Sequence, residues 1–593
     1  MNITSEAIFN SVLYGANEVI KIKEELNKIN VFPVPDGDTG SNIASMMRTI
    51  IAEAELKQSV KETVDSIANA AILGARGNSG IIFAGYLLGL SEAIVSDVTI
   101  SLEEFAHASK KAVKYAYDAI EVPVDGTIIT VMEEWGNALV DKCSKYQDIV
   151  EVFDYSIERV NKALENTKNQ LNVLKKANVV DSGAKAFTSF VFSIYDYFKH
   201  GEIEVTYKKE DYQEVNNEIN SIHSHLAVGE NRYCTECLID NFELDRNILK
   251  TEISNFGDSL VVVGNSRKCR IHIHTKDPEL FFEYINNIGK VVYQKVEDMK
   301  KQADIVNNRK NKIAIVTDSI ADLPKQYFDD EQIHLINLEI INEDRIYLDK
   351  LTISPKKMLE QIKFENNLPT SSQPNSKKIE NLFDYLSSYY ESVIVLTVSK
   401  ELSGTYNSFM KAANNYQSDN FKISVINTKQ NSGAQGLIVK SCNELISQGF
   451  SHNEIVNKIN EIIEKSKILV QVKTIDNMIK SGRLSINSGK IAKFVNLKPI
   501  VTLDKDGKGG LDSIAFSEKR SMNQLLKHIK KITKEKGIRR YSVVHVNNYD
   551  AALALSKDLK KIIGFDVDYI TETSTIVALG AGEGAIAVSY VTK

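Results

Sequence analysis

The sequence predicts a multi-domain chain in which an all-α region is followed by a small α+β domain and then by a two-lobed α/β half. At 593 residues the chain is too long to fold around a single hydrophobic core. Apolar residues recur at three- and four-residue spacing as far as residue 200, which is the periodicity of amphipathic helices. Runs of β-branched residues begin only after residue 225, where they first cluster and then alternate with helical stretches.

We expect residues 1–200 to form an all-α bundle. Segments 101–120 and 149–176 place apolar residues on one helical face, and short loops rich in Gly, Pro and Asp separate such segments. The polar, charged stretch at residues 207–224 indicates a linker between this bundle and the rest of the chain.

The remaining elements belong to two further domains. In residues 225–306 the runs YCTECLI, SLVVVG and CRIHIHT have strand character and are separated by helical patterns, which predicts a small α+β domain. In residues 312–593 strand-like runs such as KIAIVTDS, SVIVLTV and YSVVHV alternate with helical stretches. This alternation favours parallel sheets with helices on their faces, and a helix-poor gap leaves room for two lobes.

The composition excludes several classes of protein. The chain is 43% hydrophobic, carries a net charge of −6 and has no segment dense in Lys and Arg, so we expect no nucleic-acid partner. Its start lacks the pattern of a signal peptide, and the most apolar stretch, residues 71–90, is interrupted by Arg76 and Asn78, so we expect no membrane span. Five cysteines are too few for a disulfide framework and favour the cytoplasm.

Two loops of the helical region carry residues suited to phosphate chemistry. Asp36 and Asp38 lie two residues apart on a Pro/Gly-rich loop, where carboxylates can hold Mg²⁺ while phosphate oxygens and water complete its octahedron. The segment GARGNSG (residues 74–80) precedes an apolar run, so its backbone N–H groups would begin a helix and could bind phosphate. Taken singly, the first of these is also what an ordinary Asp-Gly turn looks like.

Four motifs in order identify the helical region by resemblance. NVFPVPDGDTGSN (residues 30–42), GARGNSG, PVDGTI (residues 123–128) and VVDSGAKAF (residues 179–187) resemble the ADP-binding subunit family of dihydroxyacetone kinases, and more closely its fatty-acid-kinase branch. The resemblance implies an eight-helix barrel in which Mg²⁺ and ATP are bound. The implied magnesium ligands are Asp36 and Asp38, and the implied nucleotide contacts are Asn42, Ser79, Gly80, Thr127 and Asp181.

The middle domain contains a cluster of cysteines and histidines. His272 and His274 alternate by two on a predicted strand and therefore point to one face, while Cys269 points to the other. We favour a zinc site built from Cys234, His272 and His274, with Cys237 and Cys269 as buried small residues. The segment resembles the linker domain of fatty-acid kinases, which implies a catalytic part for the two histidines; the alternative is hydrogen bonding within the sheet.

The C-terminal half carries Ser- and Gly-rich turns that suit a carboxylate at the mouth of an apolar tunnel. Singly these are ordinary turns, but TDSIADLP, PTSSQP, LSGTY, SGRLS and LKPIV occur in an order that resembles the DegV family of fatty-acid-binding proteins over residues 312–593. We expect the head-group to be bound by Ser371, Ser372, Ser403, Gly404 and, by the resemblance, Arg483.

Four positions depart from the resembled families. Ala184 and Ala186 stand where the kinase family has a glycine-rich closing loop. Near the C-terminus Gly580 occupies the place of a histidine and Glu583 that of a proline. We expect the two changes near the C-terminus to weaken head-group binding or to alter the preferred ligand.

Together these motifs predict ATP-dependent phosphorylation of a bound fatty acid to an acyl phosphate that feeds phospholipid synthesis. A carboxylate needs no general base to attack the γ-phosphate, so positioning and charge neutralisation would suffice. The implied partners are a fatty acid, a peripheral membrane acyltransferase and a second copy of the chain. The alternatives are a glycerone-type kinase, which would need a further domain with a substrate-binding histidine, and a non-catalytic lipid carrier or sensor.

Overall fold

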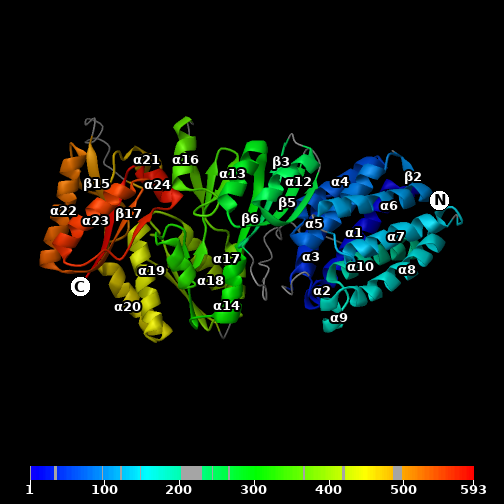
Figure 1. The fold of residues 1–593 in the computed structure, drawn as a ribbon, viewed down its shortest axis with the longest axis horizontal. Coiled ribbons are helices and arrows are strands. Elements are labelled where there is room, and N and C mark those ends of the chain that lie inside the picture. The colour runs from blue at the N-terminus through cyan, green and yellow to red at the C-terminus, as the bar shows by residue number, and fades with distance from the viewer. Residues whose placement is uncertain are drawn as a thin grey trace. The chain divides into compact units, whose positions relative to one another are not determined.

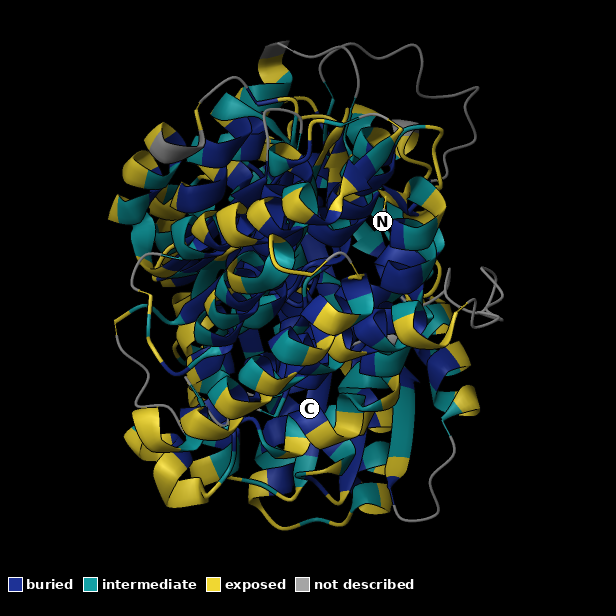
Figure 2. Cartoon of the chain, turned by 90° about the vertical axis from the view of Figure 1, so that its right-hand side faces the viewer, coloured by how far each residue is buried: buried dark blue, intermediate teal, exposed yellow. Residues whose placement is uncertain are grey.

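The computed structural model divides into two compact units, Met1–Val306 and Asn307–Lys593, which are described separately (Figure 1). Each unit has a core of buried residues. Exposed residues lie on the outer faces of the helices that face the viewer in Figure 2. No helix in the described part of the chain is both long and apolar enough to cross a bilayer. The structure describes residues 2–32, 37–96, 98–120, 123–146, 148–201, 230–242, 245–264, 268–364, 368–416, 421–484 and 497–593, so the predicted linker at 207–224 lies outside it.

The first 200 residues are helical, as predicted. Among their described residues eight helices have 15 residues or more and two have only six, and one short antiparallel strand pair joins the N-terminus to a later loop. The helices are α1 (Ser5–Lys21), α2 (Lys23–Lys28), α3 (Thr39–Glu53), α4 (Val60–Gly74), α5 (Gly77–Ala93), α6 (Leu102–Ala119), α7 (Ile128–Cys143), α8 (Ile149–Gln170), α9 (Asn172–Ala177) and α10 (Ser182–His200), and the strands are β1 (Asn2–Thr4) and β2 (Thr99–Ser101).

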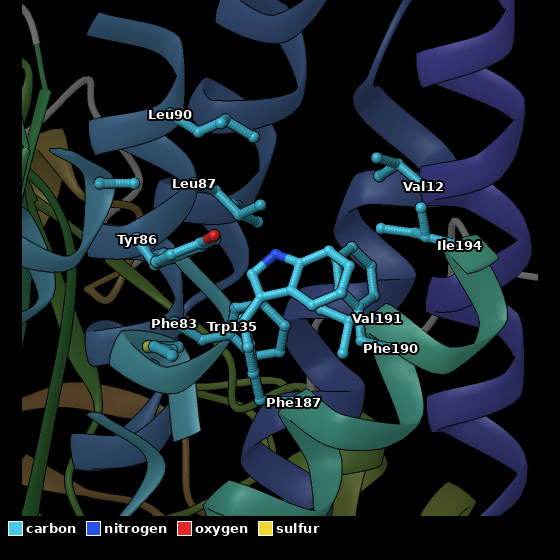
Figure 3. Packing of buried hydrophobic residues seen from close by; sticks show 14 of the residues in the cluster. Val12, Phe83, Tyr86, Leu87, Leu90, Trp135, Phe187, Phe190, Val191 and Ile194 are labelled. Carbon is cyan, nitrogen blue, oxygen red and sulfur yellow. The ribbon is translucent and has the colours of Figure 1, made fainter. Parts of the chain in front are cut away.

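Helix α5 is the centre of this bundle because it is apolar on all sides. Twelve of its residues are buried, whereas its neighbour α6 and the more distant α8 bury one face only. The core around α5 is aromatic: the Phe83 ring meets those of Phe187 and Phe190 edge-on at centroid distances of 5.4 and 5.2 Å, and Trp135 lies beside them (Figure 3). The middle of α5 is thereby packed into the core of the bundle.

The middle domain completes the first unit as an antiparallel sheet of order β4-β5-β3-β6. Its inner face packs on two helices through an apolar cluster that includes Ile271 and Phe281, and its other face contributes Leu238, Val261 and Val263 to the core of the helical bundle. The elements are β3 (Tyr233–Asp240), α12 (Arg246–Ile253), a 3-10 turn (Ser254–Phe256), β4 (Gly257–Gly264), β5 (Lys268–Thr275), α13 (Pro278–Ile288), β6 (Lys290–Asp298) and α14 (Met299–Asn308).

The first lobe of the second unit contains the predicted parallel sheet, in the order β13-β12-β7-β8. The segment between β8 and β12 forms a second, small antiparallel sheet of order β10-β9-β11. The elements are β7 (Ile313–Asp318), α15 (Lys325–Asp330), β8 (His334–Ile336), β9 (Glu339–Asn342), β10 (Arg345–Leu348), α16 (Pro355–Gln361), a 3-10 turn (Ile362–Phe364), β11 (Thr370–Ser372), α17 (Ser376–Ser387), β12 (Ser392–Thr397), α18 (Thr405–Asn415), β13 (Lys422–Asn427), α19 (Ser432–Ser447) and α20 (His452–Lys465).

The second lobe corrects the expectation of parallel sheets. Its sheet, β16-β15-β14-β19-β17-β18, is antiparallel except for the pair β17–β18. A tight turn capped by Asp504 connects β15 to β16, and such a short connection can join only antiparallel strands. The elements are β14 (Ser466–Gln471), α21 (Asp476–Lys480), β15 (Lys498–Leu503), β16 (Gly509–Ala515), α22 (Glu518–Glu535), β17 (Ile538–His545), α23 (Tyr549–Ile563), β18 (Ile570–Glu572), α24 (Thr575–Ala581) and β19 (Ile586–Thr592).

Candidate functional site

The N-terminal ends of α3 and α5 lie against each other. Asp38 is the N-cap residue of α3 and is 8% exposed, and the Asn42 side chain donates a hydrogen bond of 2.7 Å to its Oδ2. Gly77 begins α5 with φ +57°, and a Cβ added there would lie 2.4 Å from Asn42 Nδ2. Only glycine fits this position, because both the backbone angle and the contact exclude a side chain.

The N-terminal ends of α7 and α10 join the same place. Around Gly183, an added Cβ would lie 3.2 Å from Ser79 Oγ, 3.3 Å from Ile128 Cβ and 3.4 Å from Asp181 Oδ1. These atoms belong to the first turns of α5 and α7 and to the N-cap of α10. Four helix N-termini therefore gather at one end of the bundle, where free N–H groups and helix dipoles favour an anion such as phosphate.

Asp181 and Thr127 cap their helices at this end. Asp181 Oδ1 accepts a hydrogen bond of 2.7 Å from the N–H of Ala184, and burial raises the pKa of Asp181 to about 6, against the opposing effect of the N–H groups of Ala184 and Ile128. The Thr127 hydroxyl donates to the carbonyl of Val124 at 2.8 Å. Both residues thus fix the backbone around the anion site.

Six of the residues expected to bind magnesium or nucleotide come together at this end. They are Asp38, Asn42, Ser79, Gly80, Thr127 and Asp181, while Asp36 lies outside the described residues. The described donor set, a buried carboxylate beside an anion site, fits a magnesium ion that shares its ligands with phosphate oxygens. Ala184 and Ala186, in the first turns of α10, are fully buried, so helix packing occupies them.

The sheet of the middle domain brings Cys234, His272 and His274 to one point. Cys234 pairs with His274 across β3 and β5, the Sγ of Cys234 is 4.0 Å from Nδ1 of His272, and the candidate ligand atoms all lie within 4.8 Å of one another. Ligands of a tetrahedral zinc ion are roughly 3.5 Å apart, so a small closure would fit the ion. Cys237 and Cys269 are fully buried on the opposite face, among the apolar residues under α12 and α13.

The cluster lies close to the anion site. Burial raises the pKa of the Cys234 thiol well above its usual range, and the charges of Glu297, Glu236 and Asp38 add to that effect. Since Asp38 caps α3, the thiol is within electrostatic reach of the end of the bundle where the helix N-termini gather. Thiolate formation at Cys234 would therefore require a cation such as a metal ion.

Four charged or polar residues near the Cys/His cluster were not singled out from the sequence: Glu236, Arg270, Lys295 and Tyr293. Glu236 pairs with His272 across the strands, and its Oε2 accepts a hydrogen bond of 3.2 Å from Arg270. Burial opposes ionisation of Glu236, but the hydrogen bond with His272 and the charges of Arg270 and Lys295 hold its pKa well below the usual range. The ring of Tyr293 lies under the Arg270 guanidinium. Strand alternation would have identified Glu236, because it follows Cys234 by two residues and so shares its face of the sheet.

The second unit contains an apolar pocket lined, among its described residues, by one half-buried cation, Arg483. Its walls come from both lobes, from side chains such as Ile320, Leu402 and Val470. Arg483 faces it, donates a hydrogen bond of 3.0 Å to Ser371 Oγ and forms no ion pair with any described residue. Burial lowers the pKa of Arg483. A guanidinium in such surroundings is an anion-binding group.

The predicted head-group residues divide into two sets. Ser371, Ser403 and Arg483 face the pocket. Ser372, the next residue along β11, points the other way and donates to Glu339 at 3.0 Å, and neither it nor Gly404 is among the described residues that line the pocket. The Gln373 side chain covers Gly404, since an added Cβ would lie 2.2 Å from Gln373 Nε2.

Two departures noted in the sequence occupy different surroundings. Gly580 lines the pocket, and a Cβ added there would meet no described atom within 4 Å, so the position is open space. Glu583 is not among the described lining residues; its carboxylate accepts a hydrogen bond of 3.1 Å from Asn547. Glycine at position 580 therefore leaves the pocket larger than a residue with a side chain would.

Buried carboxylates hold α24, which forms one wall of the pocket. Asp322 accepts a hydrogen bond of 2.7 Å from the N–H of Ser574, and Asp349 accepts one of 2.8 Å from the N–H of Thr575. Lys350 pairs with Asp322 at 2.8 Å, and burial raises the pKa of Asp349 to about 6. Asp322, in the motif TDSIADLP, therefore has a structural part beneath the pocket.

The fold and the two sites define a multi-domain protein that combines a helical domain, in which four helix N-termini gather, with an α/β domain around an apolar pocket. Comparison with known families gives each part its identity: residues 33–196 match the DAK2 domain, residues 230–306 the FakA-like middle domain of fatty acid kinase, and residues 312–593 the DegV family. The chain is a fusion of these three domains in one polypeptide.

Curated relatives match about half of the chain. An uncharacterized protein of Staphylococcus haemolyticus (strain JCSC1435) is 33% identical over 312 residues, and one of Staphylococcus aureus (strain USA300) is 31% identical over 308 residues. Each alignment covers 51% of this chain and 56% of the relative, so the chain spans little more than half the length of these relatives.

Solved structures resemble the C-terminal half. A DegV family protein from Thermus thermophilus, described as fatty acid binding, has 23% identity and a TM-score of 0.45 over 48% of this chain and 100% of its own length. DegV of Bacillus subtilis, described as a fatty acid binding protein, has 25% identity and a TM-score of 0.44 over the same shares.

Proposed function

We propose that this protein transfers the γ-phosphate of ATP to the carboxylate of a fatty acid, giving an acyl phosphate and ADP. The observation that carries the proposal is the presence in one chain of an anion site made of helix N-termini and an apolar pocket whose half-buried arginine has no ionic partner among the described residues. The match of the middle region to a domain of fatty acid kinase supports the same reaction.

The helical domain supplies positioning and charge neutralisation. Magnesium, when bound, would neutralise the phosphate oxygens, and Asp38 is the described residue that would hold it. Asn42 orients that carboxylate, and the N–H groups at Ser79 and Gly80 cradle the phosphates. No general base is required, because a carboxylate is already an anionic nucleophile at neutral pH.

The C-terminal pocket supplies the acid. Its apolar walls would enclose the acyl chain, while Arg483 and Ser371 bind the carboxylate. This assignment agrees with the fatty acid binding described for the Thermus thermophilus and Bacillus subtilis proteins. We further propose that the acyl phosphate feeds phospholipid synthesis through a membrane-associated acyltransferase and that the chain acts as a homodimer in the cytoplasm.

The test is acyl phosphate formation by the purified full-length chain. With ATP, Mg²⁺ and a long-chain fatty acid, we expect ADP release and an acyl phosphate that hydroxylamine traps as a hydroxamate. The matched fatty alcohol, which lacks the carboxylate, should release no ADP. ADP release with glycerone but not with fatty acid would identify a glycerone-type kinase, and fatty acid bound without any ADP release would identify a carrier.

We also propose that Cys234, His272 and His274 bind one zinc ion and that the two histidines serve phosphoryl transfer. The purified chain should contain zinc at one equivalent, and His272→Ala and His274→Ala should each lose it and lower kcat by about 10- to 100-fold. Cys143→Ser is the matched control, because this half-buried thiol lies on α7. Full activity of both histidine variants without bound zinc would leave the histidines as hydrogen-bonding residues of the sheet.

A further inference from the structure

Glu236 connects the Cys/His cluster to the start of α5. Its Oε1 accepts a hydrogen bond of 3.1 Å from the N–H of Gly77 and lies 3.5 Å from Nδ1 of His272. Its Oε2 accepts the bond from Arg270. The buried Glu236 carboxylate thus contacts both His272 of the cluster and the N–H of Gly77, the first residue of α5. The next N–H groups of α5 belong to the anion site.

A second contact from the same sheet holds the same loop. The Tyr293 hydroxyl accepts a hydrogen bond of 3.3 Å from Nη1 of Arg76, the N-cap residue of α5, and the Arg270 guanidinium lies over the Tyr293 ring at 4.3 Å. Residues 76 and 77 are therefore both tied to the middle domain. The Asn42 side chain also lies against Gly77, 2.4 Å from where a Cβ would stand.

Several buried polar atoms near this contact have no hydrogen-bond partner within the described structure, among them one on His272 and one on the first turn of α5. These two atoms are Nε2 of His272, which is 4% exposed, and Oδ1 of Asn78. A buried polar atom without a partner costs about 1–3 kcal/mol, so such atoms are usually satisfied by a bound group. His272 belongs to the cluster and Asn78 to the first turn of α5, so a ligand bound at either place would satisfy one of these atoms.

We propose that Glu236 is a positioning residue that couples the Cys/His cluster to nucleotide binding. Through Gly77 it sets the direction of the following N–H groups of α5, and through His272 it responds to a divalent cation in the cluster. Coupling of this kind is reciprocal: the cation should tighten nucleotide binding by the same factor by which nucleotide tightens cation binding. The inference rests on the proposed function in taking the anion at α5 to be a nucleotide and in taking the Cys/His cluster to hold a divalent cation.

The test uses ADP and Zn²⁺ as probes of the full-length chain, by calorimetry, without any turnover. In the unaltered protein, zinc loading should tighten ADP binding about tenfold, within the usual range for linked sites. In Glu236→Gln this factor should fall to near one, because a single amide oxygen cannot serve both Gly77 and Arg270. Hydrogen exchange of residues 74–80 should slow on zinc loading in the unaltered protein only.

Two further variants separate positioning from folding and from charge. Glu236→Leu with Arg270→Met removes both partners of the buried pair, which avoids an unpaired charge and should preserve the fold, yet it should also lose the coupling. Glu297→Gln removes a carboxylate from β6 that pairs with Lys295 at 2.9 Å and should keep the coupling.

The outcomes separate this inference from the proposed function. ADP binding that is equally tight with and without zinc overturns the coupling alone. Equal loss of coupling in Glu297→Gln and Glu236→Gln also overturns it, because general charge near the cluster would then explain the effect. Failure of the unaltered chain to bind ADP would overturn both the coupling and the kinase assignment.

Discussion

Asp38→Asn should reduce ATP turnover by about 1,000-fold while leaving the apolar pocket able to retain its ligand. The substitution keeps the shape of the side chain and removes the charge that would hold magnesium, whose stabilisation of the transition state is worth several kcal/mol. Asp38 is 8% exposed at the N-terminus of α3, outside the packed aromatic core of the bundle, so the fold should survive. ADP release with fatty acid as acceptor measures the effect.

Asp154→Asn is the control for this experiment. Its carboxylate lies on α8, is over half exposed and hydrogen-bonds Tyr195, so turnover should stay within about twofold of the unaltered chain. Bound fatty acid, determined by mass spectrometry, should be the same in both variants. Normal ATP turnover in Asp38→Asn would show that the gathered helix N-termini are not the site of phosphoryl transfer.

Arg483→Met should weaken fatty-acid binding by about 10- to 100-fold. A charge-assisted hydrogen bond contributes about 1.5–3 kcal/mol, and methionine keeps an apolar stem of similar length while removing the guanidinium. Binding of the fatty alcohol of the same length should change little, because the alcohol carries no charge. The thermal midpoint of the ligand-free chain should not fall, since Arg483 has no ionic partner among the described residues and its half-buried charge is partly desolvated.

Arg540→Met gives the opposite pattern and serves as the control. Arg540 lies on β17, pairs with Asp568 at 3.3 Å and also contacts Glu444. Its loss should lower the thermal midpoint and leave fatty-acid affinity unchanged, because Arg540 is not among the described pocket residues. Equal fatty-acid affinity of Arg483→Met and the unaltered chain would place the carboxylate elsewhere.

The sequence predicted the class of each domain and much of the Cys/His cluster because both follow from short-range periodicity. Alternation by two put His272 and His274 on one face of β5 and Cys269 on the other, whatever the sheet packs against. Spacing by three and four gave the helices, and the Gly/Ser loop before α5 marked a helix N-terminus. These patterns depend on the geometry of a single strand or helix.

Other features depend on contacts between distant segments. The contact of Glu236 with α5 could not be predicted from the sequence, because its partner Gly77 is 159 residues away. Ser371 and Ser372 were equivalent in sequence, but the pairing of β11 with β9 turns only Ser371 toward the pocket. Gly580 proved to border open space, and the second lobe proved to be mostly antiparallel. Local propensity sets the conformation of a segment, whereas its partners are chosen by burial and hydrogen bonding across the whole fold, which a single sequence does not display.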